Sequence, residues 1–187
     1  MTRSTVFRIA LANVRCPATP DESVSLAENT IAAAGAASAG LVCFPECFVP
    51  GYRGAGKRVP PPDASFLEAA WSAVAGAARK ANVAVVLGTE RVVDGGGPIP
   101  TALVIDRDGT IAGFQDKVQL DPSEDTIYRP GAERRVFTTG PLTFGVVICH
   151  EGEEEDTQRA LQAGAAAYIK KPFTSEELIY VIAHLEG

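Results

Sequence analysis

Residues 19–46 read TPDESVSLAENTIAAAGAASAGLVCFPE, and this stretch decides the fold. It opens with Thr19-Pro20-Asp21-Glu22, a capping box with proline at the first helical position. Small and apolar side chains then recur with helical spacing: Val24, Ala27, Ile31 and Ala34. Gly40 ends this pattern, and the apolar run Leu41–Phe44 is typical of a buried strand. The stretch therefore predicts a helix over residues 20–38 that packs on a sheet and leads into a strand.

The same helix-then-strand pattern recurs along the chain. Ser65-Phe66-Leu67-Glu68 is a second capping box, which predicts a helix that ends near Ala81. Strands are predicted by apolar runs and by alternation over residues 6–14, 83–87, 101–105, 110–114, 135–138 and 142–149. Hairpins mixed with crossover helices indicate an α/β layered fold.

Composition excludes several classes of protein. The 187 residues include 17 basic and 23 acidic side chains, for a net charge of -6, and no basic patch. Neither a nucleic-acid partner nor a membrane partner is therefore expected, and no apolar run has the length of about 18 residues that an ordinary transmembrane helix needs. The four cysteines (Cys16, Cys43, Cys47 and Cys149) are irregularly spaced, which favours a reduced, cytoplasmic protein over a metal site.

Three chemistry-bearing residues stand at the ends of predicted strands: Glu46, Lys117 and Cys149. In α/β proteins, functional side chains gather at such strand ends. Each residue alone has a simpler interpretation. A single cysteine is most often a core residue, a single lysine is usually solvated, and a glutamate after proline can serve as a turn or capping residue. Only the combination favours a site.

The combination has a chemical meaning. A thiol has an ordinary pKa of about 8.5 and needs a base or a cation nearby to act as a nucleophile at neutral pH. The Glu46 carboxylate can take the thiol proton and later activate water. The Lys117 ammonium can stabilise the thiolate and the negative charge that develops on a substrate, and the backbone N–H of His150 can act as a second oxyanion donor.

The segments around these residues resemble the Glu–Lys–Cys motifs of the nitrilase superfamily of carbon–nitrogen hydrolases. The matching segments agree in order and approximate spacing: Phe44-Pro45-Glu46, Lys117-Val118-Gln119-Leu120 and Val147-Ile148-Cys149-His150-Glu151-Gly152. Residues 101–109 and Tyr128-Arg129-Pro130-Gly131 agree as well, so the similarity covers residues 6–152. The resemblance implies a nitrilase-like α-β-β-α sandwich, truncated here because members of the family usually continue well beyond the cysteine.

The resemblance also implies a role for each residue. Glu46 would be the general base, Cys149 the nucleophile and Lys117 the stabiliser of the tetrahedral intermediate. Glu124, seven residues after Lys117, matches the second glutamate with which the family positions substrate and lysine. The implied reaction is attack on a small nitrile, amide or N-carbamoyl compound, followed by hydrolysis of a thioester-type acyl-enzyme. No metal and no organic cofactor is expected. A sheet edge left exposed by the truncation predicts a homo-oligomer.

The composition changes near residue 150. Residues 151–187 carry 3 basic and 8 acidic side chains, whereas the preceding residues are nearly neutral. From about residue 154 the chain resembles the last helix–strand–helix of a response-regulator receiver domain, which implies a flavodoxin-like αβα tail. Lys171 would correspond to the receiver's lysine before proline, but the phosphoacceptor strand is absent, so no phosphorelay activity is expected.

We therefore expect a nitrilase-like fragment over residues 1–152 and a receiver-like tail over 153–187, packed into the same domain. A join near residues 151–154 is compatible with an engineered or recombined chimera. The sequence leaves three functions open: a carbon–nitrogen hydrolase, a non-catalytic scaffold that retains a relict Glu–Lys–Cys site, and a signalling module that acts through the tail.

Overall fold

The computed structural model describes residues 7–54, 57–93 and 96–149. The elements in chain order are β1 (Ile9–Leu11), α1 (Pro20–Ala36), β2 (Leu41–Cys43), α2 (Ala64–Ala81), β3 (Ala84–Arg91), β4 (Ile99–Ile105), β5 (Ile111–Asp116), β6 (Val136–Thr139) and β7 (Leu142–Gly145). They form an α/β fold, as predicted. No described helix combines the length and the apolar character that a membrane crossing needs.

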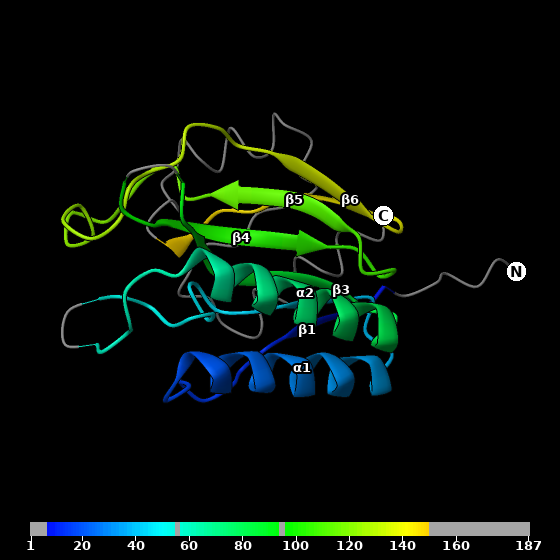
Figure 1. Ribbon diagram of the computed structural model, residues 1–187. Helices are drawn as coiled ribbons and strands as arrows, with labels where there is room; N and C mark the ends of the chain where they lie inside the picture. Colours follow the sequence, from blue (N-terminus) through cyan, green and yellow to red (C-terminus); the bar gives the residue numbers. More distant parts are fainter. Residues whose placement is uncertain (1–6, 55–56, 94–95, 150–187) are drawn as a thin grey trace, which may run out of the picture.

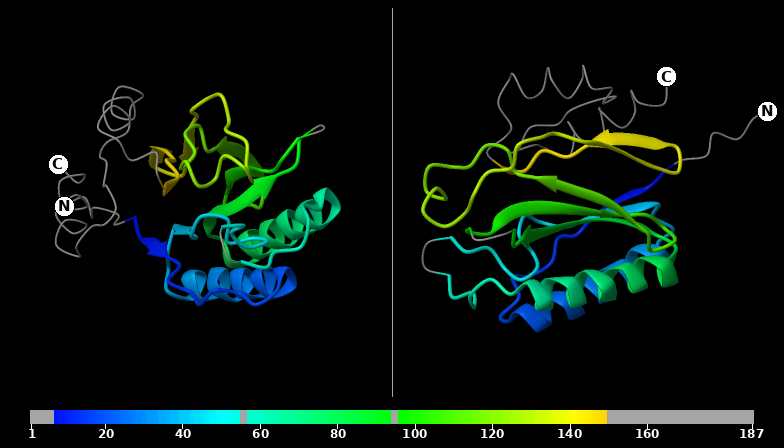
Figure 2. Two further views of the ribbon diagram at one scale, coloured as in Figure 1. Left: turned by 90° about the vertical axis from the view of Figure 1, so that its left-hand side faces the viewer. Right: turned by 45° about the horizontal axis from the view of Figure 1, so that its top comes forward.

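The described residues form three layers. The central sheet has the order β1-β2-β3-β4-β5, with parallel pairing among the first three strands and antiparallel pairing from β3 to β5. The helices α1 and α2 lie side by side on one face of this sheet, and the β6–β7 hairpin lies on the other face (Figures 1 and 2). Each face of the central sheet therefore has its own apolar core.

Helix α1 forms for the reasons read from its sequence. The Thr19 hydroxyl accepts a hydrogen bond from the backbone N–H of Glu22, at 3.1 Å, and proline occupies the first turn. Its buried stripe is Ser23, Ala27, Ile31 and Ala34. Val24, which was predicted to belong to this stripe, is half-buried. The helix ends at Ala36 rather than at Ser38, because Ser38 has a φ of 59°, in the left-handed region.

Helix α2 begins one residue earlier than its predicted capping box. The cap is Asp63, whose carboxylate accepts hydrogen bonds from the backbone N–H groups of Ser65 and Phe66, at 2.9 and 3.1 Å. A carboxylate with two suitable donors at this position competes successfully with the Ser65 hydroxyl for the cap. The helix ends at Ala81, as predicted, because Asn82 adopts the left-handed conformation.

Three strands differ most in length from their predictions. Strand β3 runs on to Arg91 because the polar residues Thr89 and Glu90 are buried inside the sheet. Strand β7 ends at Gly145, well short of Cys149. Strand β1 pairs over only three residues and forms an edge of the sheet, where Ile9 and Leu11 stay exposed. The predicted receiver-like, flavodoxin-like tail lies outside the described residues.

Candidate active site

The position of Glu46 is set where the backbone segment after β2 crosses strand β3. After β2 the chain passes over β3, where the N–H of Phe44 donates to the carbonyl of Val86, at 2.9 Å, and the N–H of Val49 donates to that of Gly88, at 3.1 Å. A Cβ atom on Gly88 would lie 1.9 Å from the carbonyl oxygen of Pro45. Only glycine lets the segment that carries Glu46 lie this close to the sheet.

Lys117 is held directly after β5, at the same end of the sheet as Glu46. Its backbone N–H donates to the carbonyl of Pro100, at 2.8 Å, and its own carbonyl accepts the N–H of Gly131, at 2.7 Å. The side chain is fully buried. Because both backbone groups of Lys117 are bonded to neighbouring segments, the direction of its buried side chain is set by the sheet.

Glu124 lies in a turn after Lys117. Its N–H donates to the carbonyl of Asp121, and the N–H of Asp121 donates back to the Oε2 atom of Glu124, both at 2.8 Å. This reciprocal pair directs the carboxylate inward, where the residue is only 2% exposed.

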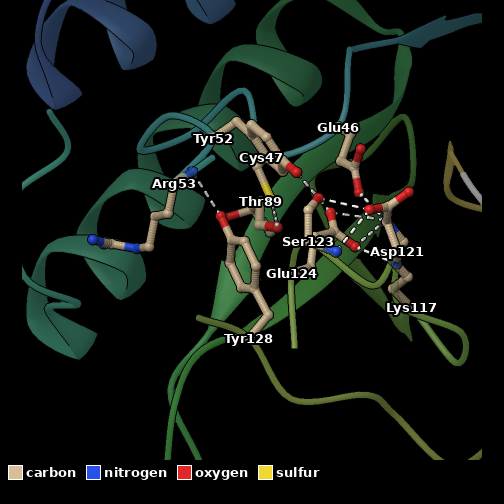
Figure 3. Close-up of polar contacts among 10 residues, drawn as sticks. All are labelled: Glu46, Cys47, Tyr52, Arg53, Thr89, Lys117, Asp121, Ser123, Glu124 and Tyr128. Atoms are coloured by element: carbon tan, nitrogen blue, oxygen red, sulfur yellow. Dashed lines mark hydrogen bonds and ion pairs between the residues drawn. The ribbon is translucent and has the colours of Figure 1, made fainter. Parts of the chain in front are cut away.

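These three side chains meet in one ion cluster (Figure 3). The Lys117 Nζ atom lies 2.8 Å from Oε1 of Glu46 and 3.0 and 2.8 Å from Oε1 and Oε2 of Glu124. Burial alone would lower the pKa of Lys117, but hydrogen bonds to Glu124 and Glu46 and their negative charges outweigh it and raise that pKa. Lys117 therefore remains a buried ammonium ion at neutral pH.

The two carboxylates have different surroundings. Glu124 is enclosed, and its oxygens accept hydrogen bonds from Lys117, from the Asp121 N–H and from the Tyr52 hydroxyl, which lies 2.9 Å away. The Glu46 side chain is 20% exposed and bonds Lys117 through Oε1. Glu46 is therefore the carboxylate that an incoming molecule can reach, whereas Glu124 is enclosed and bonded to Lys117.

Cys149 approaches this cluster from the segment after β7. The residue is exposed and has a φ of 53°, a left-handed conformation that is strained for a side chain of this kind. Burial of the sulfur raises the pKa of the Cys149 thiol, and the charge of Glu46 and a hydrogen bond to it raise it further, against the opposing effect of Lys117. The structure therefore brings together Glu46, Lys117, Glu124 and Cys149, all four side chains proposed from the sequence.

Other sequence-based expectations have different outcomes. His150, proposed as a backbone oxyanion donor, lies outside the described residues. Within the described ranges, no group of three or more His, Cys, Asp or Glu side chains is placed to hold a metal ion. A cavity of about 450 Å³ opens beside Glu46 and Tyr52, which is within the size range of small-ligand sites.

Sequence reasoning missed the residues that support the cluster. Tyr52 bonds Glu124, and the neighbouring Arg53 forms a two-pronged ion pair with buried Glu90, at 2.7 Å for both contacts. The N–H of Arg53 donates to the Tyr128 hydroxyl, at 2.8 Å. Two signals were present in the sequence: the polar pair Thr89-Glu90, which directly follows the apolar part of β3, and the family-matching segment that begins at Tyr128.

Comparison with known proteins identifies the family. The carbon-nitrogen hydrolase family matches residues 8–178. An arylacetonitrilase of Arthroderma benhamiae is 29% identical over 133 residues, which are 66% of this chain and 40% of that protein. An amidase from Nesterenkonia sp. has a TM-score of 0.76 and 27% identity, over 87% of this chain and 63% of that one.

A further solved structure concerns the active-site cysteine of such an amidase. A Glu-to-Gln variant of the amidase from Nesterenkonia sp. AN1 carries the acetamide moiety of fluoroacetamide on that cysteine. It has a TM-score of 0.74 and 25% identity, over 87% of this chain and 63% of that one.

These matches also bear on the C-terminal part and on length. The family match continues to residue 178, beyond the predicted join at residues 151–154, and so gives no support to a separate receiver-like tail or a chimera. The chain spans less than two thirds of the length of these relatives. Since the family match nevertheless includes most of its residues, the chain belongs to the carbon-nitrogen hydrolase family.

Proposed function

We propose that this chain carries the catalytic site of a cysteine-dependent hydrolase that cleaves a carbon–nitrogen bond in a small amide, nitrile or N-carbamoyl compound. The observation that carries the proposal is the fully buried Lys117 ammonium between the carboxylates of Glu46 and Glu124, beside the Cys149 thiol. Ion clusters that serve stability alone do not need an exposed nucleophile at their edge. The cysteine modified in the related amidase supports the same chemistry.

The first half-reaction uses Glu46 as the base. Because the pKa of the Cys149 thiol is raised, the thiol keeps its proton until a substrate arrives. With an amide or N-carbamoyl compound, Glu46 then accepts that proton while the sulfur forms a bond to the carbonyl carbon and the carbonyl electron pair moves onto oxygen. The Lys117 ammonium stabilises this oxyanion. With a nitrile, the sulfur adds to the nitrile carbon, the proton passes through Glu46 to nitrogen, and one water molecule adds to the thioimidate to give the corresponding tetrahedral intermediate. Collapse of the intermediate breaks the carbon–nitrogen bond, and protonated Glu46 gives its proton to the departing amine, which leaves a thioester.

The second half-reaction consumes water. Glu46, again ionised, accepts a proton from a water molecule while the oxygen of that water attacks the thioester carbon. The oxyanion that forms is stabilised again by Lys117. Collapse breaks the carbon–sulfur bond, the sulfur takes the proton back from Glu46, and the carboxylic acid leaves. Throughout the cycle Glu124 holds Lys117 and accepts no proton from the substrate.

The test is turnover of a panel of small amides, nitriles and N-carbamoyl compounds, measured as released ammonia, with Cys149→Ala as the comparison. The expected result is turnover by the unsubstituted chain and a loss of at least about 10³-fold in the variant. A covalent adduct with fluoroacetamide should map to Cys149 and should be absent from Cys149→Ala.

The outcome of this panel separates the proposal from its rival, a non-catalytic scaffold with a relict site. Equal turnover by the unsubstituted chain and by Cys149→Ala, or no turnover and no adduct at Cys149, would rule out the hydrolase.

Three further expectations belong with this proposal. The irregular spacing of the four cysteines supports a reducing, cytoplasmic setting. A homo-oligomer is supported by the exposed Ile9 and Leu11 at the β1 edge, and light scattering of the purified chain tests it. The boundary between residues 152 and 153 stays a prediction, which limited proteolysis tests.

A further inference from the structure

Tyr52 contacts the ion cluster but has no part in the steps above. It lies in the loop that follows Glu46, and its hydroxyl donates a hydrogen bond to Oε1 of Glu124, at 2.9 Å (Figure 3). Tyr52 also lines the cavity beside Glu46. This segment therefore contributes the Glu46 carboxylate to the cluster and the Tyr52 hydroxyl as a partner of Glu124.

The Tyr52 ring is held in place by ring stacking and by the bonds of the next residue, Arg53. It stacks on the ring of Tyr128, with the centroids 6.0 Å apart and the planes at 23°. The next residue, Arg53, donates its backbone N–H to the Tyr128 hydroxyl, and its guanidinium binds both oxygens of Glu90 on β3. The Arg53 side chain is 10% exposed and that of Glu90 is fully buried. Tyr52 is thus tied to the central sheet through its neighbour.

The contact matters because it completes the hydrogen bonds of Glu124. Oε2 of Glu124 is held by Lys117 and by the N–H of Asp121, whereas Oε1 is held by Lys117 and by Tyr52. If the Tyr52 hydroxyl were removed, Oε1 of Glu124 would keep only Lys117 of these two partners. The carboxylate could then turn about its terminal bond, and the Lys117 ammonium could shift with it.

We propose that Tyr52 is a positioning residue, whose hydroxyl holds the Glu124 carboxylate in the orientation that places the Lys117 ammonium at the developing oxyanion. This inference rests on the proposed hydrolase function, which it deepens. A displacement of about 1 Å in a catalytic group can lower the rate about a hundredfold. A hydroxyl with no part in bond making can therefore have a measurable effect on catalysis.

The hydroxyl can fill this role over the whole working range of pH. Burial, the hydrogen bond to Glu124 and its negative charge raise the pKa of Tyr52. The phenol therefore remains a donor wherever the hydrolase is expected to act.

The test compares Tyr52→Phe with Ser23→Ala. Ser23 is a matched control, because its buried hydroxyl donates to the carbonyl of Pro20 within α1, a helix that contributes no side chain to the ion cluster. With an amide that the unsubstituted chain hydrolyses, Tyr52→Phe should lower kcat by about 10- to 100-fold, the effect of one hydrogen bond to a charged group, and change KM by less than about threefold. Ser23→Ala should leave both constants unchanged.

A second readout does not depend on turnover. The side-chain ammonium signal of Lys117 in a ¹H–¹⁵N NMR spectrum, identified by its loss in Lys117→Arg, reports how fast its protons exchange with water. Exchange should be at least about tenfold faster in Tyr52→Phe than in the unsubstituted chain or in Ser23→Ala.

The two readouts separate the two proposals. An unchanged kcat in Tyr52→Phe, or unchanged proton exchange at Lys117, overturns the positioning role whether or not the hydrolase proposal stands. If the unsubstituted chain has no turnover but Tyr52→Phe accelerates the exchange, the hydrolase proposal fails while the structural link from Tyr52 to Lys117 holds.

Discussion

At Cys149, two charged neighbours act on the thiol in opposite directions. Sequence reasoning assigned Lys117 a part in stabilising the thiolate, but burial of the sulfur and the charge of Glu46 outweigh the lysine, and the pKa of Cys149 is raised. The site therefore resembles one that removes the thiol proton during attack rather than one that stores a thiolate. In the proposed mechanism Glu46 is the base, even though its charge disfavours the free thiolate.

Replacing Glu46 should accordingly change catalysis and thiol ionisation in opposite directions. In Glu46→Gln the base is lost, and turnover should fall by about 10²- to 10⁴-fold. The negative charge that raises the Cys149 pKa is lost too, so the thiolate should form at lower pH and alkylation should begin at lower pH. The measurement is the rate of iodoacetamide labelling at Cys149 against pH, followed by peptide mass spectrometry.

Glu68→Gln is the control for this prediction, because Glu68 lies exposed on α2. It should leave both the turnover and the labelling midpoint unchanged. A labelling midpoint that rises in Glu46→Gln would contradict the opposed effects of Glu46 and Lys117 on the thiol.

At this scale the sequence predicts which side chains gather, but not how they are supported. Glu46, Lys117, Glu124 and Cys149 could be proposed because strand ends and motifs mark them. Tyr52 carries no such mark, since its role depends on a contact with a residue 72 positions away. Such a distance along the chain leaves no pattern in a single sequence.

At the scale of elements, local signals predicted α1 and the buried parallel strands well. The end of β3 was missed because Thr89 and Glu90 look like loop residues, although tertiary partners satisfy both of them. The Thr89 hydroxyl accepts the indole N–H of Trp71, at 3.1 Å, and Glu90 pairs with Arg53. Hydrophobic alternation cannot foresee a buried polar residue whose partner comes from another segment.

Gly88→Ala tests the crossing that positions Glu46. The added methyl would meet the carbonyl of Pro45, a backbone atom that cannot move without displacing Glu46. We expect a loss of about 1–3 kcal/mol in the free energy of unfolding, together with a fall in kcat that exceeds the effect on folding. Urea unfolding and steady-state kinetics measure the two effects.

Gly76→Ala offers a matched comparison within α2, because a Cβ atom there would meet nothing within 4 Å. It should raise the free energy of unfolding by up to about 1 kcal/mol, since alanine favours a helix over glycine. If Gly88→Ala and Gly76→Ala change the free energy of unfolding and kcat by equal amounts, the close approach at Gly88 does not restrict the position of Glu46.

At the scale of the whole molecule, one ion pair links the loop that holds Tyr52 to the central sheet. Arg53 and Glu90 are both largely buried, so removing one charge leaves the other without its counter-charge in the interior. We expect Glu90→Gln to lower the free energy of unfolding by about 3–5 kcal/mol, as is usual for a broken buried pair. Thermal and urea unfolding provide the measurement.

The exposed pair of Arg15 and Glu22 serves as the comparison. Water screens such a pair, so Glu22→Gln should shift the unfolding midpoint far less than Glu90→Gln does. If the two variants lose similar amounts of stability, the Arg53–Glu90 pair is not the anchor of the loop.

The side chains of the ion cluster come from distant parts of the chain, and this separation affects the order in which the protein folds. Glu46 and Lys117 are separated by 71 positions, whereas α1, α2 and the strands next to them contact one another mostly at shorter range. Contacts that close long stretches of chain form late, because the entropy of loop closure must first be overcome. A newly synthesised copy should therefore form its helices and parallel strands before the contact between Glu46 and Lys117. Until the hairpin of β4 and β5 docks, the lysine stays hydrated and the nascent chain is inert.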